Sequence, residues 1–175
     1  MNALVFLLSV VVGLMIAEAR VSSTNEQRLR ARGAIEPAGD VYRLMAWLYP
    51  ACFLDIGAEG LGRAAHAGSP MSGIGGPSWT ASGVVLFVAS KVLKYWAIRS
   101  LGERWTFKVL VLPGVPLVRD GPYRYVAHPN YIAVVGELVG AAMMFGARIT
   151  GPVMVIAFGL ALLARLKFEQ RALQE

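Results

Sequence analysis

The sequence contains few charged side chains and very few metal ligands. Asp, Glu, Lys and Arg make up 16% of its 175 residues, whereas a soluble domain has about 25%. The single cysteine, Cys52, excludes an internal disulfide, and two histidines are too few for a zinc site built from several such ligands. Because 56% of the residues are hydrophobic, the composition indicates a membrane protein. The length of the chain suits one domain. We expect no metal site, because metal ligands are so few.

Negative charge is scarcer than positive charge, since 17 basic residues against 11 acidic ones give a formal net charge of +6. Such an excess can indicate nucleic-acid binding, but here the basic residues flank apolar stretches instead of forming one tract. Contact with anionic lipid head groups explains this distribution more simply. We therefore expect membrane lipids as partners and no nucleic acid.

Five apolar stretches are candidates for membrane-spanning helices. Three of them have the length of a bilayer crossing: Asn2–Ala19, Val41–Leu61 and Trp79–Ile98. The other two, Tyr131–Phe145 and Pro152–Ala164, are shorter and separated by a glycine-bounded turn, which is typical of an antiparallel helical hairpin. The second stretch is the weakest, because it is interrupted by Pro50, Asp55 and Glu59. The pattern predicts an all-α fold, a polytopic membrane helical bundle of about five transmembrane helices with a C-terminal hairpin.

The basic residues lie almost entirely on one side of this five-span topology. Fifteen of the 17 fall between residues 20 and 43, between 91 and 124, or after 164, and only Arg63 and Arg148 fall in the opposite loops. The positive-inside rule then puts the amino terminus outside and the carboxyl terminus in the cytoplasm. The first stretch lacks the basic n-region of a signal peptide, so we expect a retained helix.

The polar stretch Ser22–Gly33 (SSTNEQRLRARG) follows the first apolar stretch. Ser23 and Glu26 have the spacing of a capping box, and Gly33 is a suitable residue to end a helix. We interpret the stretch as a solvated cytoplasmic connector.

The stretch RDGPYRYVAHPNY, residues 119–131, gathers the side chains that could carry chemistry. Its prolines and glycines exclude a long helix, and irregular backbone beside a bilayer is tolerated only where protein or a wet cavity covers it. His128 precedes Pro129 at the mouth of the next helix, where its imidazole either hydrogen-bonds at the interface or contacts a ligand. The tyrosines are either interfacial residues or the walls of a pocket for a flat heterocycle or a sulfonium cation; they are Tyr123, Tyr125 and Tyr131.

Glu137 lies two turns into the following apolar helix, where an unpaired carboxylate is costly. It must either pair with a basic residue of the bundle or face a cavity or a ligand, and the sequence leaves both open. Gly136 and Gly140 form a GxxxG step, which lets this helix approach a neighbour closely. We expect that neighbour to be the hairpin partner.

Arg165 and Glu169 are four residues apart near the end of the last helix, so they share a face. They form either an ordinary surface pair or part of a pocket. Hairpin geometry favours the pocket, because the start of one helix and the end of the next return to the same side. We therefore expect Arg165 and Glu169 to lie close to His128.

Three stretches of the chain together resemble the isoprenylcysteine carboxyl methyltransferase family of integral-membrane enzymes: LGERWTFKV (101–109), LVRDGPYRYVAHPNY (117–131) and RLKFEQRAL (165–173). Membrane phospholipid methyltransferases share the pattern. The amino-terminal part, with ARGAIEPAGDVY at 31–42, is similar to a small bacterial branch, some members of which methylate lipophilic pyrones or phenols.

This resemblance implies a methyltransferase that uses S-adenosylmethionine, held in the cytoplasmic carboxy-terminal region of a bacterial plasma-membrane protein. Residues 99–175 would bind the cofactor and carry catalysis, and residues 1–98 would shape the substrate side of one domain, 1–175. The family pair near the methyl acceptor corresponds to Arg165 and Glu169, which we expect to be catalytic. The expected cofactor-binding residues are His128, Pro129, Tyr131, Tyr123, Tyr125, Glu137 and Gln170.

Two positions depart from the family pattern. Ala127 stands where arginine is common, and Gln170 follows Glu169 where a second glutamate is common. Glutamine still accepts a hydrogen bond but without charge assistance.

The predicted reaction is methylation of a carboxylate or hydroxyl oxygen on a lipophilic acceptor that arrives from the bilayer, such as a prenylcysteine-like, alkylpyrone-like or phenol-like molecule. Alternatives are a phospholipid N-methyltransferase, a sterol-type reductase that uses NADPH and shares a similar GPY and HPxY block, and a membrane scaffold without catalytic activity.

Overall fold

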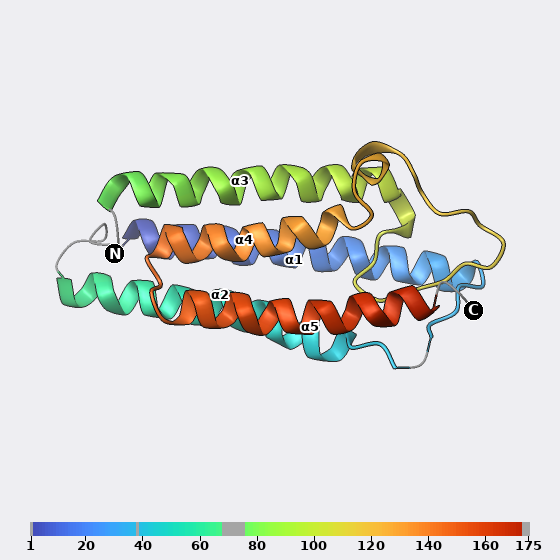
Figure 1. Cartoon of the computed structure of the whole chain (residues 1–175), viewed down its shortest axis with the longest axis horizontal. Coiled ribbons are helices and arrows are strands. Elements are labelled where there is room, and N and C mark those ends of the chain that lie inside the picture. Colours follow the sequence, from blue (N-terminus) through green and yellow to red (C-terminus); the bar gives the residue numbers. More distant parts are fainter. Residues whose placement is uncertain (1, 38, 68–75, 173–175) are drawn as a thin grey trace.

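The computed structural model describes residues 2–37, 39–67 and 76–172. Within these ranges the chain forms five long helices that lie along a common axis (Figure 1). They are α1 (Asn2–Ala31), α2 (Tyr42–Ala67), α3 (Gly76–Leu101), α4 (Pro129–Phe145) and α5 (Thr150–Ala172). Two short 3-10 helices, η1 (Gly102–Arg104) and η2 (Gly121–Arg124), lie between α3 and α4. The predicted all-α bundle of five helices is confirmed.

Three stretches of the described helices are long and apolar enough to cross a membrane: Ala3–Ala31, Ser78–Arg104 and Thr150–Glu169. Pro129–Phe145 is a shorter apolar helix. These four stretches belong to α1, α3, α5 and α4. Helix α2, which contains Pro50, Asp55 and Glu59, is not among these stretches, although it is one continuous helix that includes Pro50.

One end of the bundle collects the segments that the sequence analysis singled out. The carboxyl ends of α1 and α5 lie there together with the connections 32–41 and 102–128, on the right of Figure 1. We call it the basic end. The turn from α4 to α5 lies at the opposite end. The predicted convergence of residues 99–131 with the end of the last helix is therefore confirmed.

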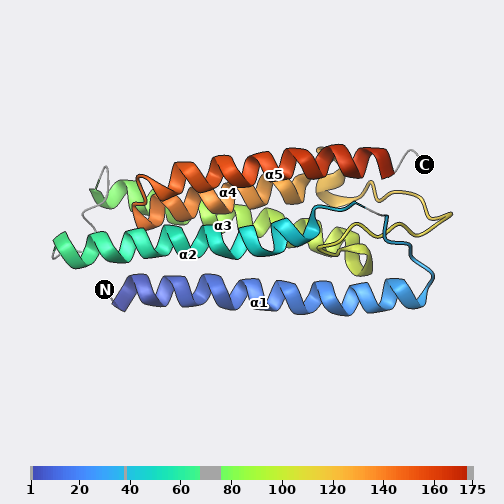
Figure 2. The ribbon, with the colours of Figure 1, turned by 90° about the horizontal axis from the view of Figure 1, so that it is seen from below.

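Helix α1 is longer than its apolar stretch and continues into Ser22–Gly33, which we interpreted as a solvated connector; most of this stretch is exposed, but one of its faces is buried. The helix runs without a break to Ala31, and Ser22, Asn25 and Leu29 are buried in its last third. A helix of 30 residues is about 45 Å long, whereas the hydrocarbon core of a bilayer measures about 30 Å. The polar third therefore projects past the apolar layer, along one side of the bundle (Figure 2).

The close approach allowed by the GxxxG step is made to α3, and not to the hairpin partner that we expected. A Cβ atom added at Gly140 would lie 2.7 Å from the backbone nitrogen of Phe87, and one at Gly83 would lie 2.6 Å from that of Met144. A Cβ atom at Gly136 would meet the hydroxyl oxygen of Ser90 at 2.2 Å. Helix α4 is thus pinned to α3 on one face while it packs against α2 and α5 elsewhere.

A buried group of charges joins α1, α3 and α4. Glu18 of α1 accepts hydrogen bonds from Lys91 (2.7 Å) and Lys94 (2.6 Å) of α3. Both lysines also pair with Glu137 Oε2 of α4, at 3.2 and 3.4 Å, and Tyr49 of α2 donates to the same oxygen. Lys91 and Lys94 had been counted among the basic residues of the cytoplasmic loops, and the structure corrects this: they neutralise two carboxylates inside the bundle.

The carboxylate of Glu59, another interruption of the second apolar stretch, also has a partner. It accepts hydrogen bonds from the backbone N–H groups of Arg148, Ile149 and Thr150, so α2 caps the first turn of α5. Gly146, with a φ of 64°, ends α4 and starts this turn, as its place in the predicted hairpin suggested.

Glu18→Gln is expected to lower the free energy of unfolding by about 3–5 kcal/mol, because it leaves two buried ammonium groups with one carboxylate. A denaturant titration in detergent measures the change. Glu103→Gln is the matched control, because Glu103 is exposed and pairs with exposed arginines, so the expected loss is below about 1 kcal/mol. Equal losses in the two variants would contradict a role of the buried charges in holding the bundle.

Candidate functional site

Residues 121–131 reach the basic end of the bundle through two local constraints. Helix η2 packs against the end of α3, and Gly121 permits this contact because a Cβ atom there would overlap the hydroxyl of Ser100. Pro129 then occupies the first turn of α4, and His128 takes the non-helical position before it. The imidazole of His128 stacks on the ring of Tyr131, with centroids 5.2 Å apart and planes 3° apart.

Tyr131 connects this stack to the end of α5. Its hydroxyl donates a hydrogen bond to Glu169 Oε2 at 2.6 Å and accepts one from Arg165 Nε at 3.1 Å. His128 Nδ1 lies 3.9 Å from the same carboxylate oxygen. His128, Tyr131, Arg165 and Glu169 therefore form one contiguous group, which we call the core site. Two sequence motifs more than 30 residues apart supply its members.

Arg165 is the most enclosed charge of the core site, with 7% of its surface exposed. Besides Tyr131, its guanidinium donates to the carbonyl oxygen of Phe107 and contacts the sulfur of Met45 at 3.9 Å. Nη1 also lies 3.8 Å from Asp40 Oδ1. The side chain of Glu169, in contrast, is 25% exposed, and that of His128 is 31% exposed. The group thus presents a carboxylate and an imidazole to its surroundings and keeps its guanidinium enclosed.

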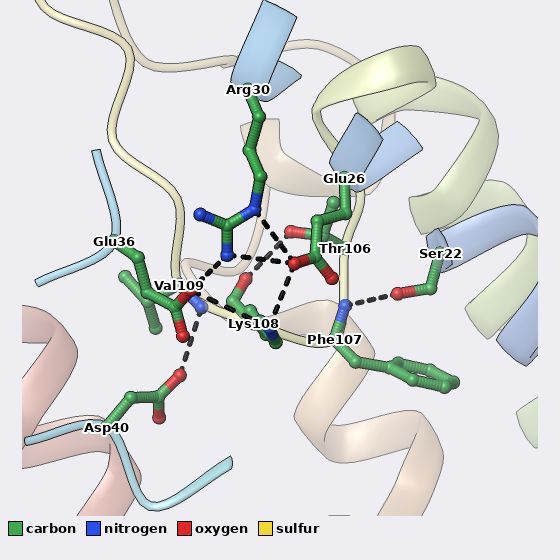
Figure 3. Close-up of polar contacts among 9 residues, drawn as sticks. All are labelled: Ser22, Glu26, Arg30, Glu36, Asp40, Thr106, Phe107, Lys108 and Val109. Carbon is green, nitrogen blue, oxygen red and sulfur yellow. Dashed lines mark hydrogen bonds and ion pairs between the residues drawn. The ribbon is translucent and has the colours of Figure 1, made fainter. Parts of the chain in front are cut away.

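The polar third of α1 holds residues 105–109, which carry the Phe107 carbonyl. Asn25 donates to the carbonyl oxygen of Trp105 at 2.8 Å, and Ser22 accepts a hydrogen bond from the backbone N–H of Phe107 at 2.8 Å. Figure 3 shows Ser22 and Glu26 of α1 directed at this segment. Lys108 donates to Glu26 at 2.8 Å, and this hydrogen bond raises the pKa of the Lys108 ammonium.

Asp40 ties the same segment to the start of α2. Its Oδ2 accepts a hydrogen bond from the backbone N–H of Val109 at 3.1 Å (Figure 3), and its Oδ1 accepts one from that of Tyr42 at 3.1 Å. Gly39, with a φ of 97°, brings Asp40 to this position, and a Cβ atom there would lie 3.4 Å from the ring of Phe168 on α5. The connection 32–41 therefore reaches the same helix end as Arg165.

The remaining predicted site residues lie at different distances from the core site. Burial and the negative charge of Glu169 raise the pKa of Tyr123 to about 12, so this phenol interacts electrostatically with the core site. Tyr125 is 73% exposed, and Pro129 is buried in the first turn of α4. Glu137 is engaged with Lys91 and Lys94 inside the bundle, as described above. The side chain of Gln170 lies outside the described residues.

Sequence reasoning missed the residues that support Arg165 from other elements. Asp40 and Phe107 lie in two stretches that carry the family resemblance, 31–42 and 101–109, but neither stretch carries a signal that points to Arg165. The polar third of α1, in contrast, did carry a signal in the sequence. Its buried or segment-contacting residues recur at the spacing of one helix face: Ser22, Asn25, Glu26 and Leu29.

Sequence comparisons with known proteins show the family of the chain. The sequence profile of the isoprenylcysteine carboxyl methyltransferase (ICMT) family matches residues 83–175, which include every member of the core site. A protein of Bacillus subtilis (strain 168) described as uncharacterized protein YpbQ is 31% identical over 169 residues, which is 97% of this chain and 95% of that protein. An uncharacterized protein of Haemophilus influenzae is 30% identical over 92 residues, or 52% of this chain and 54% of that protein.

No solved structure matches the chain. The profile nevertheless covers more than half of the sequence, and the Bacillus relative aligns with nearly all of it. Three helices of the length and apolar character of membrane spans agree with an integral membrane protein. The chain belongs to the isoprenylcysteine carboxyl methyltransferase family, a family of membrane methyltransferases.

Proposed function

We propose that the protein transfers a methyl group from S-adenosylmethionine to a carboxylate or hydroxyl oxygen of a lipophilic acceptor. The observation that carries this proposal is the core site, in which Tyr131 joins Glu169 and Arg165 while His128 stacks on it. The family supplies the general reaction, methyl transfer at a membrane. The acceptor class and the use of S-adenosylmethionine are our extension of it.

The charges and acceptors around the core site fit a cationic methyl donor. Asp40 and Glu169 lie around one arginine, so the local formal charge is negative when His128 is neutral. A donor with a sulfonium, an ammonium and an amino-purine group offers the positive charge and the N–H groups that these acceptors need.

His128 and Tyr131 would hold the donor, with their stacked rings as one wall beside it. When bound, S-adenosylmethionine supplies a methyl group activated by a positively charged sulfur. Methyl transfer joins the acceptor oxygen to the methyl carbon while the carbon–sulfur bond breaks and its electron pair stays on sulfur. The chain contributes chiefly alignment of the two partners and exclusion of water.

Glu169 and Arg165 have complementary roles at the acceptor oxygen in this proposal. Oε2 of Glu169 is engaged by Tyr131, and its Oε1 has no hydrogen-bond donor among the described residues. Oε1 can therefore take the proton of an acceptor hydroxyl. The enclosed charge of Arg165 favours an acceptor oxygen that carries negative charge, because a fixed positive group acts strongly where water is excluded.

We also propose that the basic end faces the cytoplasm. With Lys91 and Lys94 assigned to the bundle interior, the loops and helix ends there still hold nearly all other basic residues of the chain. The site is then at the inner membrane face, where a soluble methyl donor and a bilayer-borne acceptor can meet.

Ligand binding separates the proposed reaction from its rivals. S-adenosylhomocysteine is expected to raise the melting temperature of the purified protein in detergent, because a ligand that binds only the folded state at 100 times its Kd adds about 2.7 kcal/mol. NADPH is expected to have no effect. Stabilisation by NADPH alone would favour a reductase, and stabilisation by neither would favour a scaffold.

Glu169→Gln is expected to lower kcat by about 100-fold or more, because the amide cannot accept the acceptor proton. Its melting temperature should change little, since glutamine still accepts the Tyr131 hydrogen bond. Lys167→Gln, at an exposed position of the same helix, is the control and should retain the parent rate. Parallel losses of rate and stability in Glu169→Gln would indicate a structural role instead.

Mass spectrometry of lipid extracts identifies the acceptor. Cells with the active protein are expected to contain a lipophilic species one CH₂ unit heavier than its precursor, and cells with Glu169→Gln are expected to lack it. Fragmentation that puts the added methyl on oxygen agrees with the proposal. A methyl group on the amine of a phospholipid head group would favour the N-methyltransferase alternative.

A further inference from the structure

We propose that Asp40 is a positioning residue for methyl transfer, which acts through Arg165. The inference rests on the proposed function, since it assigns a role in that reaction to a residue from the amino-terminal half of the chain. Asp40 lies outside the segment that the family profile matches, residues 83–175. The stretch 31–42, which contains Asp40, contributes to the family resemblance, but no spacing in the sequence links Asp40 to Arg165; the folded structure does.

Asp40 and Arg165 form an enclosed ion pair. The side chain of Asp40 is 4% exposed and that of Arg165 is 8% exposed, with Oδ1 and Nη1 3.8 Å apart. Opposite charges that water does not screen interact more strongly than surface pairs. Among the described residues, Asp40 is the carboxylate closest to the guanidinium of Arg165. Its removal would leave an enclosed guanidinium with neutral acceptors alone.

Asp40 also fixes a neutral hydrogen-bond acceptor of Arg165. Its Oδ2 holds the backbone N–H of Val109, and Val109 belongs to the 105–109 segment whose Phe107 carbonyl accepts from the guanidinium. Asp40 therefore acts on Arg165 by direct charge and by placing this carbonyl. Both contacts restrict the rotation of the same planar group.

Arg165 also determines the direction in which the hydroxyl hydrogen of Tyr131 points. Arg165 Nε donates to the hydroxyl oxygen of Tyr131, which leaves the hydroxyl hydrogen to point at Glu169. A guanidinium that rotates away would free the Tyr131 oxygen and allow the hydroxyl to turn from the carboxylate. Asp40 thus acts indirectly, through Arg165, on the hydrogen bond that the hydroxyl of Tyr131 donates to Glu169.

Capping of α2 alone does not account for this arrangement. The hydrogen bond from the backbone N–H of Tyr42 uses one oxygen of Asp40, and an asparagine serves such positions about as well as an aspartate. The negative charge of Asp40 attracts the guanidinium of Arg165, and its second oxygen, Oδ2, accepts a hydrogen bond from the backbone N–H of Val109. Asp40→Asn therefore removes the charge while it keeps the size and an acceptor at the start of α2.

The test combines a structural and a kinetic readout on the whole protein in detergent. The ¹⁵Nε–H resonance of Arg165, assigned by its loss in Arg165→Lys, reports how firmly the guanidinium is held, and no methyl donor is needed to record it. Asp40→Asn is expected to speed its exchange with water at least tenfold. Glu36→Gln, a neighbouring carboxylate that pairs with Arg30 and Lys108, is the matched control and should leave the resonance unchanged.

In turnover assays, Asp40→Asn is expected to lower kcat at least tenfold, with the Kd of S-adenosylhomocysteine changed less than threefold. In the Arg165→Lys background, Asp40→Asn should change kcat less than twofold, because a residue that acts through Arg165 has little further effect once Arg165 is replaced. Independent, multiplying losses would overturn the proposal. An unchanged Arg165 resonance in Asp40→Asn would overturn it as well.

Gly39→Ala provides a second variant that deletes no polar group. A side chain at this left-handed position strains the turn that carries Asp40, so the Arg165 resonance should change in the same direction as in Asp40→Asn. An unaltered resonance would again contradict the proposal. Failure of the parent protein to bind S-adenosylhomocysteine would overturn the proposed function instead, and the resonance would still decide whether Asp40 holds Arg165.

Discussion

Every charge removed from water in an apolar bundle needs a partner, and this requirement organises the molecule. In the bundle, Glu18 and Glu137 are neutralised by Lys91 and Lys94 across three helices. At the basic end, Arg165 is enclosed by acceptors from α4, the 105–109 segment and the connection 32–41. The first cluster fixes how α1, α3 and α4 are packed. The second depends on that packing, because α4 carries Tyr131 and α1 holds the 105–109 segment that contacts Arg165.

The helices and their order follow from apolar length and from the partition of basic residues, so they could be predicted. Three features could not, because each depends on which faces meet. Lys91 and Lys94 read as loop charges until Glu18 is known to lie beside them. The glycines of α4 indicate that a helix packs closely against it but not which helix, and in the structure that helix is α3. The polar third of α1 reads as solvated, although one of its faces is covered by residues 105–109.

The core site was predictable to the extent that short motifs carry it. Hairpin topology brought His128 and Tyr131 to Arg165 and Glu169, as expected from helix direction alone. Its supports were not predictable, since Asp40 and Phe107 lie far from Arg165 in the chain, and the stretches that contain them, 31–42 and 101–109, do not show which of their groups meet Arg165. Glu137 illustrates the converse. Its buried carboxylate suggested contact with a bound ligand, but its partners among the described residues are two lysines and a tyrosine of the bundle.

The unbroken length of α1 has a mechanical consequence. Because α1 is one continuous helix, a tilt of its apolar part in the hydrocarbon also moves its polar third, which hydrogen-bonds residues 105–109. Hydrophobic mismatch changes helix tilt at a cost of only fractions of a kcal/mol per Å. Ser22, Asn25 and Glu26 would shift with such a tilt relative to the carbonyl that holds Arg165. Bilayer thickness thereby becomes a variable that acts on the geometry of the core site from outside it.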